Sequence, residues 1–241
     1  MVETTALDKL GKGVKIAEKH REKRKHEGFL ADLFRGNMTL DTFFPWPERA
    51  QEDLEKEKAM MEELETILSQ KVNAEEIDQK QEIPQELLEE LSRKGFFALK
   101  VPTDFGGKGL SQTAYANIVE LTASYSSAIV IIVSADNTIG CKYPVLRYGT
   151  PDQKARYLTE LTKWPSGFCF TEDLVGSDPA RMRTYAFRLR DANGDITGYE
   201  ISGQKWYTTN SALAENVPLA KYLAVVARIV DSPDEVESSD I

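Results

Sequence analysis

Two short polar stretches contain the side chains best suited to binding a cofactor. The first, residues 168–178 (FCFTEDLVGSD), offers the hydroxyls of Thr171 and Ser177 around a glycine turn. The second, residues 202–210 (SGQKWYTTN), adds the flat indole of Trp206. Short hydroxyls, turn N–H groups and one flat aromatic suit a heterocycle rich in hydrogen-bond acceptors, such as an isoalloxazine. The ordinary alternative stays open, because hydroxyl-rich turns are common and a tryptophan is often a core residue.

Four sequence motifs occur in the order and spacing of one enzyme family. Along the chain they are Gly95-Phe96-Phe97 with the loop 101–110 (VPTDFGGKGL), the helix start 148–154 (YGTPDQK), Thr171-Glu172 with Gly176-Ser177-Asp178, and Lys205-Trp206-x-Thr208-x-Asn210. Together they resemble the acyl-CoA dehydrogenase family over roughly residues 87–230. The resemblance implies an enzyme that introduces an α,β double bond into an acyl-CoA thioester with FAD as its cofactor.

The resemblance also implies roles for individual residues. Phe168 and Thr171 are expected to line the flavin, with the Thr171 hydroxyl bonding the pyrimidine edge. Trp206 is expected to flank the ring system, and Thr208 to reach toward flavin N5. Ser177 is expected to contact the CoA arm of the substrate.

No catalytic residue is assigned within the chain. In the family, a glutamate of the C-terminal helical bundle removes the α-proton while a hydride leaves the β-carbon, and no residue here matches that glutamate. Glu172 lies in the flavin motif, but its position belongs to a structural turn acid. Residues 173–175 (DLV) stand where the family commonly has Pro-Gly-small, and Asp173 adds a negative charge that weakens the case for a CoA contact at Ser177. Asp178 favours the dehydrogenase branch over the related oxidases.

Two other classes of function remain open at this point. A flavin monooxygenase or oxidase on the same scaffold would keep the ring contacts, whereas a non-catalytic half-subunit would pair with a homologue. The chain is expected to be either a fragment of a longer protein or completed by another polypeptide. The implied partners are an acyl-CoA substrate, an electron-transfer flavoprotein or similar acceptor, and further copies of the chain in a homo-oligomer.

Composition narrows these choices. The chain has 241 residues and a net charge of −9, which argues against binding nucleic acid or an anionic membrane. The two cysteines, Cys141 and Cys169, lie in apolar contexts and are expected to be buried thiols rather than a disulfide. No metal site is expected, because both histidines lie in the charged N-terminal region. The apolar run 128–133 is too short for a membrane span, so a cytoplasmic protein is expected.

The hydrophobic pattern predicts an α+β fold. An N-terminal extension (1–50) precedes an α-helical bundle (51–164) and then a partial antiparallel β-domain (165–241), without the C-terminal helical bundle of the family. One continuous central helix is predicted over 128–146, since its apolar pattern is longer than a strand. After residue 164 the pattern alternates with period two around an Asn-Gly hairpin at 191–195. The apolar run 223–229 is predicted to be one strand buried on both faces.

Overall fold

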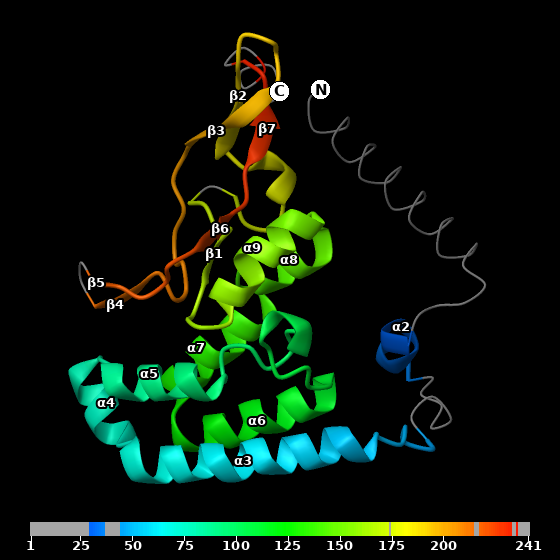
Figure 1. Cartoon of the computed structure of the whole chain (residues 1–241), viewed down its shortest axis with the longest axis vertical. Helices are drawn as coiled ribbons and strands as arrows, with labels where there is room; N and C mark the ends of the chain where they lie inside the picture. The colour runs from blue at the N-terminus through cyan, green and yellow to red at the C-terminus, as the bar shows by residue number, and fades with distance from the viewer. Residues whose placement is uncertain (1–28, 37–43, 174, 215–216, 233–234, 236–241) are drawn as a thin grey trace, which may run out of the picture. The chain divides into compact units, whose positions relative to one another are not determined.

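The structure is a computed structural model, and it describes residues 29–36, 44–173, 175–214, 217–232 and 235. It divides into two compact units, residues 1–49 and 50–241. The described helix of the first unit is α2 (Phe29–Phe34), which has no buried residue. The candidate cofactor residues all belong to the second unit (Figure 1).

Helices occupy the first part of the second unit, as the sequence predicts. They are α3 (Gln51–Lys71), α4 (Ala74–Lys80), α5 (Gln85–Lys94), α6 (Gln112–Tyr125), α7 (Ser127–Thr138), α8 (Lys142–Tyr148) and α9 (Pro151–Leu161), with a 3₁₀ turn, η2 (Thr103–Phe105). The long helices α3 and α6 lie side by side (Figure 1).

Local sequence signals set the helix ends. The Ser111 side chain accepts a hydrogen bond from the Ala114 N–H at the start of α6. Thr150 and Gln153 form a reciprocal capping box at the start of α9. Gly95 ends α5 in the left-handed conformation at φ 87°, which glycine adopts without a steric penalty. Each of these helix ends is therefore explained by residues next to it in the sequence.

A large apolar core holds α3, α5, α6 and α7 together, and a smaller cluster of Cys141, Leu158 and Leu161 lies at α8 and α9. The largest fully buried side chains of the large core come from α3, α5, α6 and α7 and from the segment after α5: Leu64, Leu68, Leu87, Leu88, Leu91, Phe96, Phe97, Leu99, Ile118, Ile129 and Val133. Asn137 ties this segment to α7, since its amide accepts from the Leu99 N–H (2.8 Å) and donates to the Phe96 carbonyl (2.9 Å).

The prediction of one helix over 128–146 is wrong, because the stretch is broken between α7 and α8. The break contains Gly140, where a Cβ atom would lie 2.6 Å from Ser166 Oγ and 2.8 Å from the Asp136 carbonyl oxygen. The chain therefore turns where it must approach Ser166 closely. Hydrophobicity alone does not report such a requirement.

The same stretch is the one candidate for a membrane span among the described residues. Residues Ser127–Tyr148 are long and apolar enough by composition, and 39% of their most apolar window is buried. Core helices of water-soluble proteins meet the same criterion. Asn137 attaches one face of this stretch to the segment after α5, while Ile131, Ile139 and Tyr143 are exposed.

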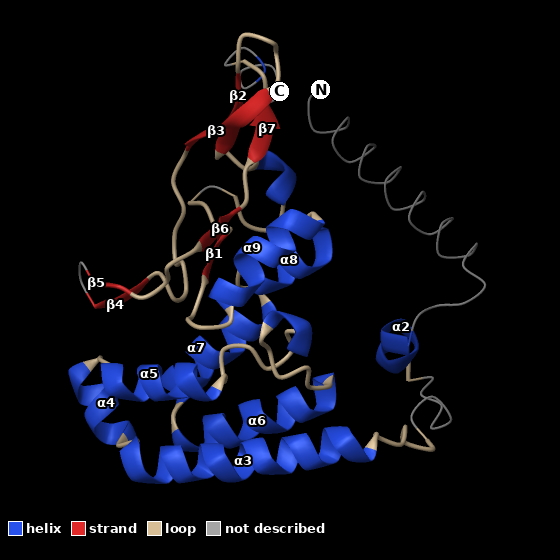
Figure 2. Ribbon diagram, in the orientation of Figure 1, coloured by secondary structure: helices blue, strands red, loops and turns tan. Residues whose placement is uncertain are grey.

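Seven short strands follow the helices in the described part of the chain (Figure 2). They are β1 (Gly167–Cys169), β2 (Tyr185–Arg190), β3 (Ile196–Ser202), β4 (Ala212–Ala214), β5 (Val217–Pro218), β6 (Leu223–Val225) and β7 (Arg228–Val230). Helices followed by strands confirm the predicted fold class. The prediction of purely antiparallel strands is corrected in one respect, because the ladders are mixed. The β2–β3 and β4–β5 pairs are antiparallel, whereas the β1–β6 and β2–β7 pairs are parallel, since β6 and β7 return to strands that are distant in sequence. The hairpin at 191–195 joins β2 to β3 as predicted.

The prediction of one buried strand over 223–229 is also wrong. The run is split into β6, which pairs with β1, and β7, which pairs with β2. Leu223 is 48% exposed and Ile229 is 54% exposed, so neither strand is covered on both faces. The split arises because the chain passes from one small sheet to another. Which strand each half pairs with depends on tertiary structure and cannot be read from the run itself.

The loop after α5 gives a test of the helical unit. A Cβ atom on Gly107 would overlap the Val101 carbonyl group, and the loop is fixed by the Gly109 N–H donating to that carbonyl (2.9 Å). Gly107→Ala should therefore lower the free energy of unfolding by about 1–3 kcal/mol, measured by urea denaturation. Gly198→Ala is the control, because its Cβ would meet its nearest neighbour at 3.9 Å. Equal effects of the two changes would contradict the tight approach at Gly107.

Candidate functional site

The two polar stretches lie side by side in the fold. The backbone N–H of Trp206 donates to the backbone carbonyl of Thr171 at 2.9 Å. This bond joins the segment after β1 to the segment after β3. Phe168 lies within β1, one residue from Gly167. Thr208 lies beside Gly167, since its methyl would be 3.4 Å from a Cβ atom placed there. The four predicted cofactor residues thus occupy two neighbouring segments.

The polar groups of these segments are available for a ligand. Trp206 is 42% exposed, and its one ring contact in the described structure is with Tyr207, at 6.2 Å between centroids. Thr171 and Ser177 are exposed, and Thr208 is half-buried. Their three hydroxyls have no hydrogen-bond partner among the described residues. The exposure of Trp206 argues against the alternative that it is an ordinary core residue.

Ser177 lies apart from these contacts. It follows the bridge between Glu172 and Val175 and precedes the 3₁₀ turn η3 (Pro179–Arg181). Asp178 forms an exposed ion pair with Arg181 at 3.7 Å. In the described part of the chain no hydrogen bond connects Ser177 to Thr171 or Trp206, so its predicted role in binding CoA stays a prediction.

Glu172 is fully engaged in bonds within the protein. Its carboxylate accepts from the Thr184 N–H (3.0 Å), the Thr184 hydroxyl (2.6 Å), the Arg183 N–H (2.5 Å) and the Lys205 ammonium (2.7 Å). Burial opposes ionisation, but these donors outweigh it and hold the pKa of Glu172 at about 2. A carboxylate with so low a pKa that accepts four hydrogen bonds has a structural role. It is unsuited to act as the general base of a reaction.

Comparison with known proteins gives consistent matches to one family. The family model for the acyl-CoA dehydrogenase N-terminal domain matches residues 54–164. The probable acyl-CoA dehydrogenase FadE10 of Mycobacterium tuberculosis is 32% identical over 216 residues, which is 89% of this chain and 32% of the relative. The very long-chain specific acyl-CoA dehydrogenase of Macaca fascicularis is 32% identical over 80% of this chain and 29% of its own length. These matches support membership of the chain in the acyl-CoA dehydrogenase family.

Solved structures agree with this assignment. An acyl-CoA dehydrogenase from Bacillus anthracis complexed with FAD superposes with a TM-score of 0.58 at 26% identity, over 82% of this chain and 33% of that one. A glutaryl-coenzyme A dehydrogenase in complex with glutaryl-CoA gives a TM-score of 0.57 at 25% identity, over 68% of this chain and 41% of that one. The chain spans about a third of the length of the curated relatives that it matches.

The residues present fit the flavin of the acyl-CoA dehydrogenase family. A flat, acceptor-rich ring needs a flat wall and several donors, and the site supplies a half-exposed indole beside hydroxyls without partners. Nearby, Phe168 and Phe170 stack at 5.7 Å, with their rings 10° apart. Among the described residues no group of acidic, cysteine or histidine side chains could hold a metal ion.

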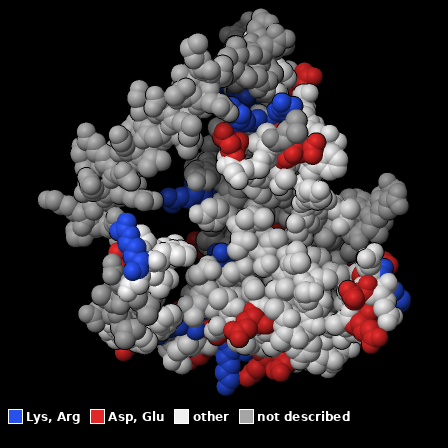
Figure 3. Space-filling model, turned by 180° about the vertical axis from the view of Figure 1, so that it is seen from behind, with Lys and Arg blue, Asp and Glu red and all other residues white. Residues whose placement is uncertain are grey.

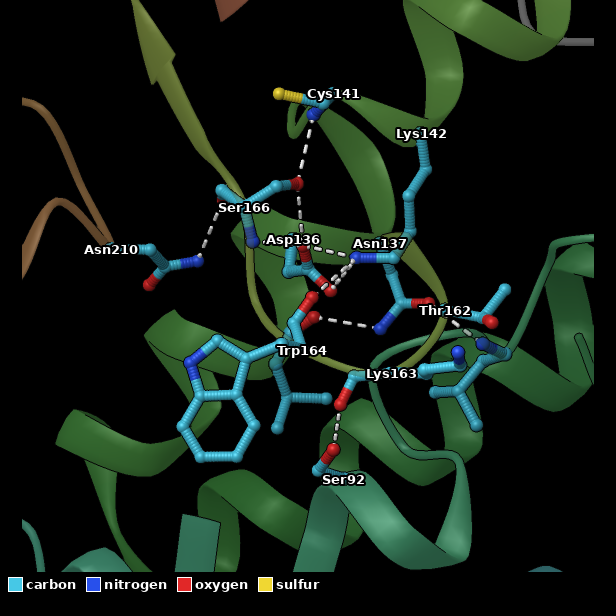
Figure 4. Close-up of polar contacts among 12 residues, drawn as sticks. Ser92, Asp136, Asn137, Cys141, Lys142, Thr162, Lys163, Trp164, Ser166 and Asn210 are labelled. Carbon is cyan, nitrogen blue, oxygen red and sulfur yellow. Dashed lines mark hydrogen bonds and ion pairs between the residues drawn. The ribbon is translucent and has the colours of Figure 1, made fainter. Parts of the chain in front are cut away.

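A buried polar network behind the site is the largest feature that the sequence analysis missed (Figure 4). Lys142 donates to both carboxylate oxygens of Asp136 at 2.6 Å, and both side chains are almost fully buried. Asp136 Oδ1 also accepts from the Ser166 N–H (2.8 Å) and hydroxyl (2.9 Å). The Ser166 carbonyl in turn accepts from the Asn210 amide at 3.3 Å. The network therefore connects α7 and α8 to the start of β1 and to the end of the Trp206 segment.

Two charged residues in an otherwise apolar stretch were the available signal for this network. Asp136 and Lys142 both fall within the predicted central helix. Burial raises the pKa of Asp136 and lowers that of Lys142, while their mutual attraction opposes both shifts. Burial also raises the pKa of the neighbouring Cys141 to about 11, so this cysteine stays a thiol. Both cysteines are free and buried, as predicted.

Uncharged surface extends over the middle of the face shown in Figure 3, and the charged side chains gather toward its margins. Exposed large apolar side chains include Ile131 on α7, Ile139 directly after α7, Tyr143 on α8 and Leu223 on β6.

Glu172 should make the stability of the fold sensitive to acid. Its pKa of about 2 lies below the ordinary value of 4.5, so its stabilising bonds are intact above pH 4.5 and are lost as the pH falls toward 2. Glu172→Gln should lower the free energy of unfolding at pH 7 and flatten its decline between pH 4.5 and 2. Urea denaturation at a series of pH values measures both effects. Glu200→Gln, an exposed change on β3, is the control, and an unchanged slope in Glu172→Gln would contradict the assignment.

The buried pair should show strong energetic coupling. Lys142→Met leaves an uncompensated carboxylate and should cost about 3–5 kcal/mol of unfolding free energy. Asp136→Asn keeps an amide that can still bond Ser166, and the double change removes both charges. The double variant should therefore cost clearly less than the sum of the two single changes, as measured in a double-mutant cycle. Additive costs would contradict a direct ion pair.

Proposed function

We propose that this chain provides the flavin-facing part of an FAD-dependent acyl-CoA dehydrogenase, which removes hydrogen across the α,β carbons of an acyl-CoA thioester. The observation that supports the proposal most directly is the joining of the two cofactor segments. The Trp206 N–H bonds the Thr171 carbonyl, so the indole and the free hydroxyls of Thr171 and Thr208 belong to one local surface. Family membership and a relative complexed with FAD support the choice of cofactor.

Each residue has a distinct role in this proposal. When bound, FAD supplies the electron-accepting ring that takes the hydride of the substrate. The Thr171 and Thr208 hydroxyls would donate to the heteroatoms of the ring, which favours its electron-rich reduced form. Trp206 and Phe168 would contact the ring system and exclude water from it. Ser177 would contact the CoA arm, beside the exposed negative charge of Asp173.

The proton chemistry is assigned to no residue of this chain. Glu172 is excluded as the base, because all its bonding capacity serves Lys205, Arg183 and Thr184. The proposal therefore leaves removal of the α-proton to a carboxylate outside residues 1–241. It also includes a cytoplasmic location, an electron-transfer flavoprotein or similar acceptor, and assembly with further copies or a completing polypeptide.

Replacement of Trp206 tests the cofactor surface. Trp206→Ala removes a half-exposed indole, so it should weaken FAD binding about tenfold or more while the melting temperature changes little. Trp206→Phe should retain most of the binding, since it keeps a flat ring. Quenching of flavin fluorescence gives the affinity, and thermal denaturation gives the stability. An Ala variant that melts much earlier, yet binds FAD normally below its transition, would overturn the assignment.

The reaction class has its own test. Anaerobic addition of an acyl-CoA to the FAD-loaded protein, together with any completing polypeptide, should bleach the absorbance of the oxidised flavin. Oxidase or monooxygenase chemistry would instead consume dioxygen during turnover. Sustained dioxygen consumption without reduction of an artificial electron acceptor would contradict the dehydrogenase assignment.

A further inference from the structure

Glu172 and Lys205 form an ion pair directly behind the candidate flavin surface. Their charged groups are 2.7 Å apart, and their side chains are only 5% and 8% exposed. Lys205 also donates to the Phe170 carbonyl at 3.1 Å and contacts Met182 Sδ at 3.7 Å. One buried ammonium thus binds both sides of the segment that contains Thr171.

The pair connects three separate stretches of the chain. Glu172 fixes the segment after β1, Lys205 fixes the segment after β3, and the Glu172 bonds to Arg183 and Thr184 fix the start of β2. Gly203 strengthens this junction, because it has φ 147° and a Cβ atom there would lie only 2.6 Å from Thr184 Cα. The backbone before Lys205 therefore lies directly against Thr184, the residue before β2 that Glu172 also binds.

The residues next to the pair in sequence are the proposed cofactor residues. Thr171 precedes Glu172, and Trp206 follows Lys205. The members of the pair are buried, whereas Thr171 and Trp206 are exposed. In an extended chain, neighbouring side chains point to opposite sides. Fixing the positions of the buried Glu172 and Lys205 therefore also fixes the positions of the exposed Thr171 and Trp206. The 2.9 Å bond from the Trp206 N–H to the Thr171 carbonyl sets the separation of the two segments.

We propose that Glu172 and Lys205 are a positioning pair that holds the Thr171 and Trp206 segments together as a preformed flavin-binding surface. The inference rests on the proposed function and deepens it. A buried ion pair contributes little net stability, because the cost of desolvating two charges offsets their attraction. Its geometry is nevertheless demanding, and it orders the groups bonded to it. Loss of Lys205 alone would still leave Glu172 with three donors, the Arg183 N–H and the Thr184 N–H and hydroxyl. The destabilisation should therefore be confined to the segments that the pair joins, and cofactor affinity should fall more than the stability of the helices.

Lys205→Met, Lys205→Arg and Lys80→Met test the pair. Lys80→Met is the matched control, because Lys80 forms a comparable 2.6 Å ion pair with Glu76 that is exposed and lies on α4. Each full-length variant is titrated with FAD and melted. Hydrogen exchange is followed at the Trp206 N–H and at the buried amides of α6. The exchange measurement needs no flavin, so it reports on the pair even in a protein that binds none.

Lys205→Met should weaken FAD binding about tenfold, which is the effect of losing one charge-assisted hydrogen bond that orders the site. It should also speed exchange at the Trp206 N–H while α6 stays protected. Lys205→Arg should restore much of both properties, and Lys80→Met should match the wild type. Unchanged exchange at Trp206 in Lys205→Met would overturn the inference. So would a uniform loss of protection with a large drop in melting temperature, since the pair would then only stabilise the fold. A wild-type protein that takes up no FAD would instead overturn the proposed function, and the exchange result would still decide the role of the pair.

Discussion

The rest of the structure depends on the bonds that the buried carboxylate of Asp136 accepts from Lys142 and Ser166. Asp136 lies on the central helix α7, is almost fully buried, and accepts bonds from Lys142 on α8 and from both the N–H and hydroxyl of Ser166. Ser166 immediately precedes β1, so this side chain attaches the first strand to the helices. A buried carboxylate is stable only when donors surround it, which is why the helix breaks at Gly140 to bring Lys142 and Ser166 within reach.

A second buried carboxylate repeats this arrangement within the strands. Glu172 gathers Lys205, Arg183 and Thr184 around itself and so joins three stretches that are distant in sequence. The two networks lie at opposite ends of the short segment 166–172, which contains Phe168 and Thr171. That segment forms only three residues of strand, and its parallel partner β6 is equally short. Side-chain networks, rather than an extensive sheet, therefore define its position.

The separation between buried charge networks and exposed binding groups explains how a small, partly exposed group of strands can present a defined binding surface. The buried charges face inward and are fully bonded, while the hydroxyls of Thr171 and Thr208 and the ring of Trp206 face outward without partners in the described structure. A ligand that supplies acceptors and a flat apolar face would complete the unpaired side. Preformed geometry of this kind lowers the entropic cost of binding.

The sequence by itself determined the order of helices and strands, the caps at Ser111 and Thr150, the stop at Gly95 and the hairpin at 191–195, because these features depend on neighbouring residues. It also placed the candidate cofactor residues, through motifs that are continuous in the chain. It did not reveal the break at Gly140 or the splitting of 223–229 into two strands. Both depend on which distant segment packs there, and an apolar run fits either outcome. The pairing of Asp136 with Lys142 and of Glu172 with Lys205 was likewise decided only by the tertiary structure, since the partners of a buried charge are set by three-dimensional proximity and not by sequence pattern.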